Sequence, residues 1–143
     1  MLATIGFFAL AIFGLGALTV ATDVDIIAIS GLGQLPGAIG MLVGLGAFAA
    51  TLWVSIRRGR PSFSSVVVIA LATALAHLVT VWLGVLVASG DPIVALVVAG
   101  ALVRGGASVV LLLAAAVAGW AGIALRRTRA RRPQWPWERD DDE

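Results

Sequence analysis

The chain has 143 residues, of which 60% are apolar and only 13% are charged. Its mean hydropathy of +1.04 is more than the core of a soluble domain of this length can hold, so the composition excludes an ordinary water-soluble enzyme. The lack of cysteine excludes disulfides, thiolate metal sites and a catalytic thiol. We therefore predict an integral membrane protein.

Four apolar segments are long enough to cross a bilayer as helices. About 20 predominantly apolar residues are needed, because every backbone amide and carbonyl in the hydrocarbon must be paired within the segment. We predict an all-α integral membrane fold with four transmembrane helices in two similar hairpins, and with a short apolar outer segment between the spans of each hairpin. The predicted spans cover residues 2–22, 36–56, 65–88 and 105–125.

The fourth span is harder to delimit, since the chain is almost wholly apolar over residues 92–125. A helix of that length would measure about 51 Å, well beyond the thickness of the hydrocarbon. Arg104, Gly105 and Gly106 are the expected break, because adjacent glycines weaken a helix and an arginine is costly at mid-bilayer. A single long tilted helix is the alternative.

The arginine distribution predicts the orientation. Cytoplasmic loops are enriched in arginine, and one arginine block follows the second span while another follows the fourth. We expect both termini in the cytoplasm and a cytoplasmic (inner) membrane location. A cleaved signal peptide ending near Ala21 is the competing interpretation, but the basic segment that should precede its apolar run is missing. The two blocks are Arg57, Arg58 and Arg60, and Arg126, Arg127, Arg129, Arg131 and Arg132.

His77 is the one titratable side chain predicted near the bilayer midplane, and Thr73 and Thr80 share its helical face. An ionisable residue in the membrane is a functional candidate for a proton path, anion passage or haem ligation. Haem ligation by two histidines would need a second His77 from another protomer. Because the spans offer no further titratable group, we interpret the histidine as structural, hydrogen-bonded to a threonine or to a carbonyl of a neighbouring helix.

The outer side is predicted to carry Asp23, Asp25 and Asp91 with a single cation, Arg104. The arginine could bind an anionic headgroup or substrate, although snorkelling to the interface or pairing with an aspartate explains it more simply. Asp91 precedes Pro92, a pair typical of a helix N-cap and first helical residue.

Small residues mark the faces on which the spans should pack. In lipid, close backbone approach at glycine and alanine supplies much of the attraction between helices. These faces could close the bundle or bind another protein, and we favour packing within the chain. They contain Gly40 and Gly44 on the second span, and Ala114, Ala118 and Gly122 on the fourth.

The segment after the last span, residues 126–143, is predicted to be a cytoplasmic interaction element. Its five arginines are expected to lie against anionic lipid headgroups, which favours membrane lipids over nucleic acid as the basic region's partner. Trp135 and Trp137 follow, then an acidic end. The two indoles could fill a pocket on a partner protein or lie among the headgroups.

The two halves follow one plan of span, outer segment, span and arginine block, which fits either an internal duplication or two unrelated hairpins. Four short spans, an Asp-Val-Asp-Ile-Ile outer loop, a Gly-Gln-Leu-Pro-Gly turn and an arginine-rich tail resemble small four-span membrane proteins of high-GC Gram-positive bacteria. This resemblance brings no function with it.

The sequence contains no motif for zinc hydrolysis, phosphate binding or a serine nucleophile. We therefore expect no catalytic residues, metal or cofactor. Our first hypothesis is an accessory, scaffold or regulatory subunit that associates with another membrane protein or with itself. The alternative is a small oligomeric transporter or channel with a path involving His77 or Arg104.

Overall fold

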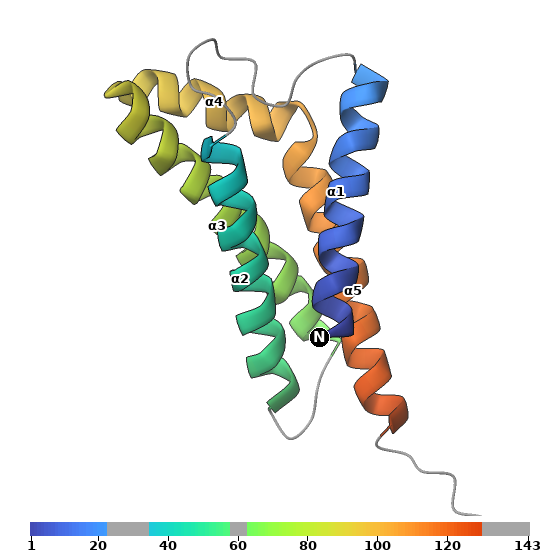
Figure 1. The fold of residues 1–143 in the computed structure, drawn as a ribbon. Coiled ribbons are helices and arrows are strands. Elements are labelled where there is room, and N and C mark those ends of the chain that lie inside the picture. The colour runs from blue at the N-terminus through green and yellow to red at the C-terminus, as the bar shows by residue number, and fades with distance from the viewer. Residues whose placement is uncertain (23–34, 58–62, 130–143) are drawn as a thin grey trace, which may run out of the picture.

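The computed structural model describes residues 1–22, 35–57 and 63–129 of the chain (Figure 1). Within these residues all regular structure is helical, and four of the helices are long and apolar enough to cross a membrane. The predicted all-α fold with four candidate spans is confirmed. The helices are α1 (Leu2–Thr22), α2 (Leu35–Arg57), α3 (Ser64–Ser89), α4 (Pro92–Arg104) and α5 (Ala107–Arg129).

The turn between α3 and α4 is built by local chemistry. Gly90 ends α3 in the left-handed conformation at φ 67°, and its N–H donates to the carbonyl of Leu86 at 2.9 Å. Asp91 then caps α4, since its carboxylate accepts a hydrogen bond from the N–H of Ile93 at 2.7 Å. Pro92 takes the first turn of α4, where no amide hydrogen is needed. The predicted N-cap is confirmed.

The predicted break before the last span is also present, and the single long helix is wrong. Gly106 has φ of +84°, which turns the chain between α4 and α5. At Gly105 the constraint is space, because a Cβ would lie 2.9 Å from the carbonyl oxygen of Ala101. The short α4 consequently lies across one end of the bundle, while α5 runs down its length (Figure 1).

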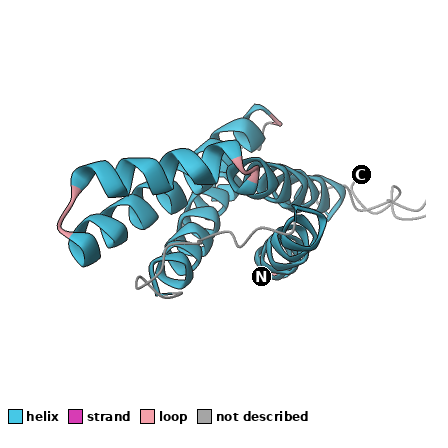
Figure 2. Ribbon diagram, turned by 90° about the horizontal axis from the view of Figure 1, so that it is seen from above, coloured by secondary structure: helices cyan, strands magenta, loops and turns pink. Residues whose placement is uncertain are grey.

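Neighbouring long helices pack antiparallel: α2 packs on α3, and α5 packs as extensively on α3 as on α1 (Figure 1). Between α1 and α5, the contacts run from Ala3 and Gly122, through Gly14 and Val110, to Leu18 near Gly106. The first two spans, which follow one another in the chain, share few contacts. Seen from above, α1 lies beside α5 and away from the α3–α4 pair (Figure 2).

Two apolar clusters hold the bundle. The larger one joins α1, α2, α3 and α5, and Phe7 of α1 stacks on Phe48 of α2 with ring centroids 4.6 Å apart. The smaller one lies where α4 crosses α3 and the start of α5, and it includes Val85, Val98 and Leu102. The α4 helix is therefore tied to the bundle by buried aliphatic side chains.

The described cations are unevenly distributed. Arg57, Arg126 and Arg127 lie at the end of the bundle that also holds the start of α1, and we name this the arginine end (Figure 1). The guanidinium of Arg57 lies 4.6 Å from the ring centre of Trp53, and that of Arg127 lies 4.7 Å from the ring centre of Phe63. Several predicted charged positions fall outside the described residues, namely Asp23, Asp25, Arg58, Arg60, Arg131 and Arg132.

A matched pair of glycine substitutions tests the break. Gly106→Ala should lower the free energy of unfolding by about 1 kcal/mol, because alanine is strained at positive φ. Gly100→Ala lies in the middle of α4 with open space around its Cβ, so it should leave stability unchanged or raise it. Unfolding of the purified protein by SDS, followed by circular dichroism, measures both. Equal effects of the two substitutions on stability would contradict the assignment of a positive φ to Gly106 in the turn between α4 and α5.

Candidate functional site

The buried polar side chains of the described residues lie on α2 and α3. Thr73 is fully buried, and His77 and Ser55 are 7% and 8% exposed. Thr73 and His77 are four residues apart, so they share one face of α3, and this face is packed against α2. The predicted intramembrane polar site is therefore an element of the α2–α3 interface.

His77 lies against the glycine face predicted on the second span. A Cβ built on Gly40 would be 3.3 Å from Cδ2 and 3.4 Å from Nε2 of the imidazole, and one built on Gly44 would be 3.5 Å from the Cβ of His77. The same Gly40 position would meet Cγ2 of Val81 at 2.6 Å. The two glycines thus form a notch that receives the histidine. The predicted glycine face of the second span and the predicted polar site at His77 are therefore the two sides of one helix contact.

The threonines near His77 are not its hydrogen-bond partners. The hydroxyl of Thr73 donates to the carbonyl of Ile69 at 2.7 Å, and the hydroxyl of Thr80 donates to the carbonyl of Ala76 at 2.7 Å. Both donors are therefore used within α3, as is common for threonine in helices. The expected hydrogen bond from His77 to a threonine or neighbouring carbonyl is absent from the described part of the chain, so the imidazole is held there by packing.

The predicted outer charge site is not assembled within the described residues. Asp91 caps the first turn of α4, whereas Arg104 is the last residue of that 13-residue helix and is exposed. A helix of this length separates its ends by about 20 Å, so these two charges are not a pair. Asp23 and Asp25 fall outside the described residues. No group of three or more potential metal ligands comes together among the residues that are described.

The small residues of α5 face the interior. Ala114 and Ala118 are buried, and a Cβ built on Gly122 would lie 3.1 Å from that of Ala3 and 3.4 Å from Cδ1 of Leu52. These residues therefore let α5 approach α1 and α2, as expected for packing within the chain.

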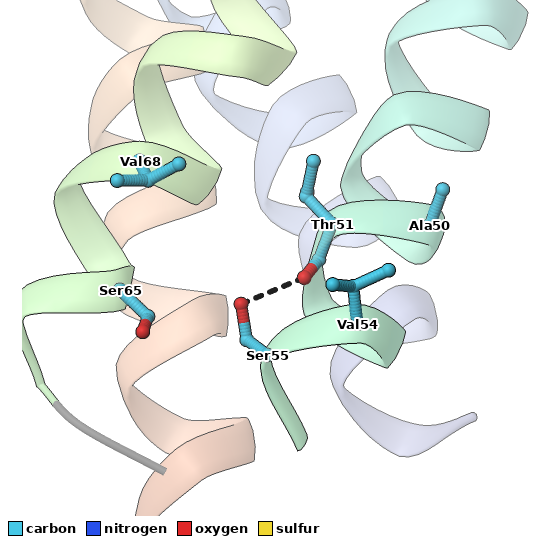
Figure 3. Close-up of a pocket in the computed structure, with 6 residues that line it drawn as sticks. All are labelled: Ala50, Thr51, Val54, Ser55, Ser65 and Val68. Carbon is cyan, nitrogen blue, oxygen red and sulfur yellow. Dashed lines mark hydrogen bonds between the residues drawn. The ribbon is translucent and has the colours of Figure 1, made fainter. Parts of the chain in front are cut away.

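A mainly apolar groove between α2 and α3 was not predicted. It has a volume of about 270 Å³ and lies near the arginine end, lined by Thr51, Ser55 and Ser65 with apolar neighbours (Figure 3). The hydroxyl of Thr51 donates to the carbonyl of Ala47, and that of Ser55 donates to the carbonyl of Thr51. The sequence signal that could have indicated this groove is the spacing of four residues between Thr51 and Ser55, which places both hydroxyls on one face of α2. No charged side chain lines the groove, so it offers no acid, base or activated nucleophile.

The glycine notch predicts a specific energetic coupling. Gly40→Ala should lower the free energy of unfolding by about 1 to 3 kcal/mol, because the new methyl group overpacks against Val81. Val81→Ala removes the opposing methyl groups, so the double variant should lose less stability than the sum of the two single variants. SDS unfolding of the four proteins gives the coupling energy.

The control is Gly46→Ala on the opposite face of α2, where nothing lies within 4 Å of an added Cβ. This variant should keep the parent stability to within about 0.5 kcal/mol. Additive losses in the double variant, or equal losses at Gly40 and Gly46, would show that the notch does not receive α3.

Comparison with known proteins supplies a family but no assigned activity. A family model described as a family of unknown function, DUF6121, matches residues 1–143. No curated protein and no solved structure matches the chain. The match extends over the whole sequence, from the first apolar span to the acidic end. The chain belongs to this family of unknown function, DUF6121.

Proposed function

We propose that the protein is a non-enzymatic accessory or scaffold subunit of a membrane complex, and that it contacts a second membrane protein through the open face of α2. The proposal includes a cytoplasmic-membrane location with both termini in the cytoplasm. Four apolar helices long enough to span a membrane support a multi-pass membrane protein, and the arginine end supports the orientation.

The main observation behind this proposal is that α2 has two faces with small residues, of which only one is packed against another helix of the chain. Gly40 and Gly44 are filled by side chains of α3. On another face of the same helix, Gly46 has nothing within 4 Å of an added Cβ. One turn later, Ala50 is exposed at the edge of the groove between α2 and α3. Because the used face shows how such a surface binds a helix in this protein, the open face supports docking of a helix from another chain.

The poor coverage of α1 supports the same proposal. Only 11% of its span is buried within the bundle, compared with 39% of the span formed by α5. The α1 helix packs on α5 and has few contacts with α2, which leaves wide apolar surface on both first spans. Lipid covers such surface at no hydrophobic cost, so a partner would be selected by shape and close approach.

The chemistry of the interior favours a binding role over transport or catalysis. The buried hydroxyls of Ser55 and Thr73 donate to carbonyls of their own helices, and His77 faces a glycine notch. Arg104 is exposed at the end of α4. The transporter hypothesis therefore gains no specific observation from the described residues. Trp135 and Trp137, which lie outside these residues, are proposed as a second, cytoplasmic contact.

Substitution of the open glycine tests the subunit role. Gly46→Leu should abolish co-purification of a stoichiometric membrane partner after extraction in mild detergent, because the larger side chain prevents close helix approach. Gly100→Leu is the control, since it adds the same bulk to an open position on α4. Mass spectrometry identifies the partner, and two differently tagged copies show whether it is a second copy of this chain. An unchanged complex in Gly46→Leu would overturn the proposal.

The proposed orientation is tested by cysteine labelling, which is simple because the chain has no cysteine of its own. Cysteines introduced singly at Asp25 and Asp91 should react with an impermeant thiol reagent in intact cells, and one at Gly59 should react only after lysis. If only the Gly59→Cys variant were labelled in intact cells, the orientation would be the opposite of the one proposed.

A further inference from the structure

A second cavity, of about 400 Å³, lies at the arginine end between α1, α2 and α5. This volume is within the range of small-molecule binding sites. Its lining is mainly apolar with a polar part, and Arg126 supplies the one charged side chain. The cavity is lined by Met1, Leu2, Ala3, Leu52, Ile56, Gly122, Leu125 and Arg126.

The cavity follows from the way the helices pair. The first two spans touch at the stacked rings of Phe7 and Phe48, and the wall residues Ala3 and Leu52 lie four positions from these rings, one turn nearer the arginine end. Beyond the stack, α1 follows α5 and α2 follows α3. Gly122 of α5 also lines the space, where it lets α5 approach Ala3 and Leu52. An apolar opening therefore remains between α1 and α2.

Arg126 and Arg127 are adjacent in the sequence but serve different faces of α5. Arg127 lies over the ring of Phe63, at the start of α3. Arg126 instead lines the cavity beside Ile56 and Gly122. Within the part of the chain that the structure describes, Arg126 has no ion pair and no hydrogen bond. Its charge is therefore available to a ligand that occupies the cavity.

We propose that this cavity binds one anionic phospholipid, with an acyl chain between α1 and α2 and the phosphate on Arg126. The occupant must combine a long apolar part with a negative group at the end of the bundle, and a phospholipid at the membrane surface has this amphipathic form. A guanidinium binds phosphate through paired, charge-assisted hydrogen bonds. The site does not depend on the proposed subunit role, because all its walls come from this chain.

The test compares phosphatidylglycerol with phosphatidylcholine by native mass spectrometry of the purified full-length protein. The parent protein should carry one phosphatidylglycerol per chain and prefer it to phosphatidylcholine. Arg126→Gln should weaken phosphatidylglycerol binding about fivefold, which corresponds to the loss of one near-surface charge contact. Arg127→Gln removes the same charge from the same end and should leave the affinity of this first lipid unchanged.

Filling the cavity provides the second arm. Ile56→Trp should remove the bound lipid, because the indole occupies the space of the acyl chain. Val54→Trp adds the same ring to an exposed position of α2 outside this cavity and should retain the lipid. Circular dichroism confirms that each variant is folded.

Three results would overturn the site. Equal weakening by Arg126→Gln and Arg127→Gln would indicate general attraction of the arginine end to anionic lipid. Retention of the lipid in a folded Ile56→Trp protein would place it elsewhere. Equal binding of the two phospholipids by the parent protein would show that the guanidinium of Arg126 does not select an anionic lipid.

Discussion

Close approach of helices at small residues is the interaction on which the rest of this structure depends. In lipid, two apolar helices gain little by replacing acyl chains with each other, so the pairs that form are those whose backbones can come near. Gly40 lets α2 approach His77 and Val81 of α3, and Gly122 lets α5 approach Ala3 of α1. Each of these glycines faces a side chain of the helix with which it pairs.

The same pairing of helices produces the two features on which the functional proposals rest, namely a cavity and an uncovered helix face. Because α1 packs on α5 and α2 packs on α3, the first two spans share few contacts. One of these contacts is the stack of Phe7 on Phe48. A cavity with Arg126 in its lining lies between α1, α2 and α5 on the arginine side of this stack, and the Gly46 face of α2 is uncovered. Packing within the bundle thereby determines where the proposed lipid and protein contacts lie.

Much of the fold could be predicted from the sequence, because span length and the break at Gly105 and Gly106 depend on local hydropathy and backbone chemistry. The pairing of helices was not predictable in the same way. The expected hairpins place consecutive spans side by side. The third and fourth spans, α3 and α5, do pack together, but α1 packs on α5 and has few contacts with α2. Apolar spans carry little sequence signal for their partners, so this pairing could not be predicted. His77 shows the same limit, because helical spacing placed threonines on its face but could not show that their hydroxyls donate within α3.

The pairing of α1 with α5 is tested most directly by a disulfide in this cysteine-free chain. With cysteines at Ala3 and Gly122, the two Cβ atoms lie 3.1 Å apart, and a disulfide requires about 3.5 to 4.5 Å, so a small adjustment forms the bond. Oxidation in native membranes should cross-link this pair efficiently. Cysteines at Ala9 and Gly46, on the exposed faces of α1 and α2, should remain reduced. A cross-link between Ala9 and Gly46 positions, with none between Ala3 and Gly122 positions, would contradict the arrangement.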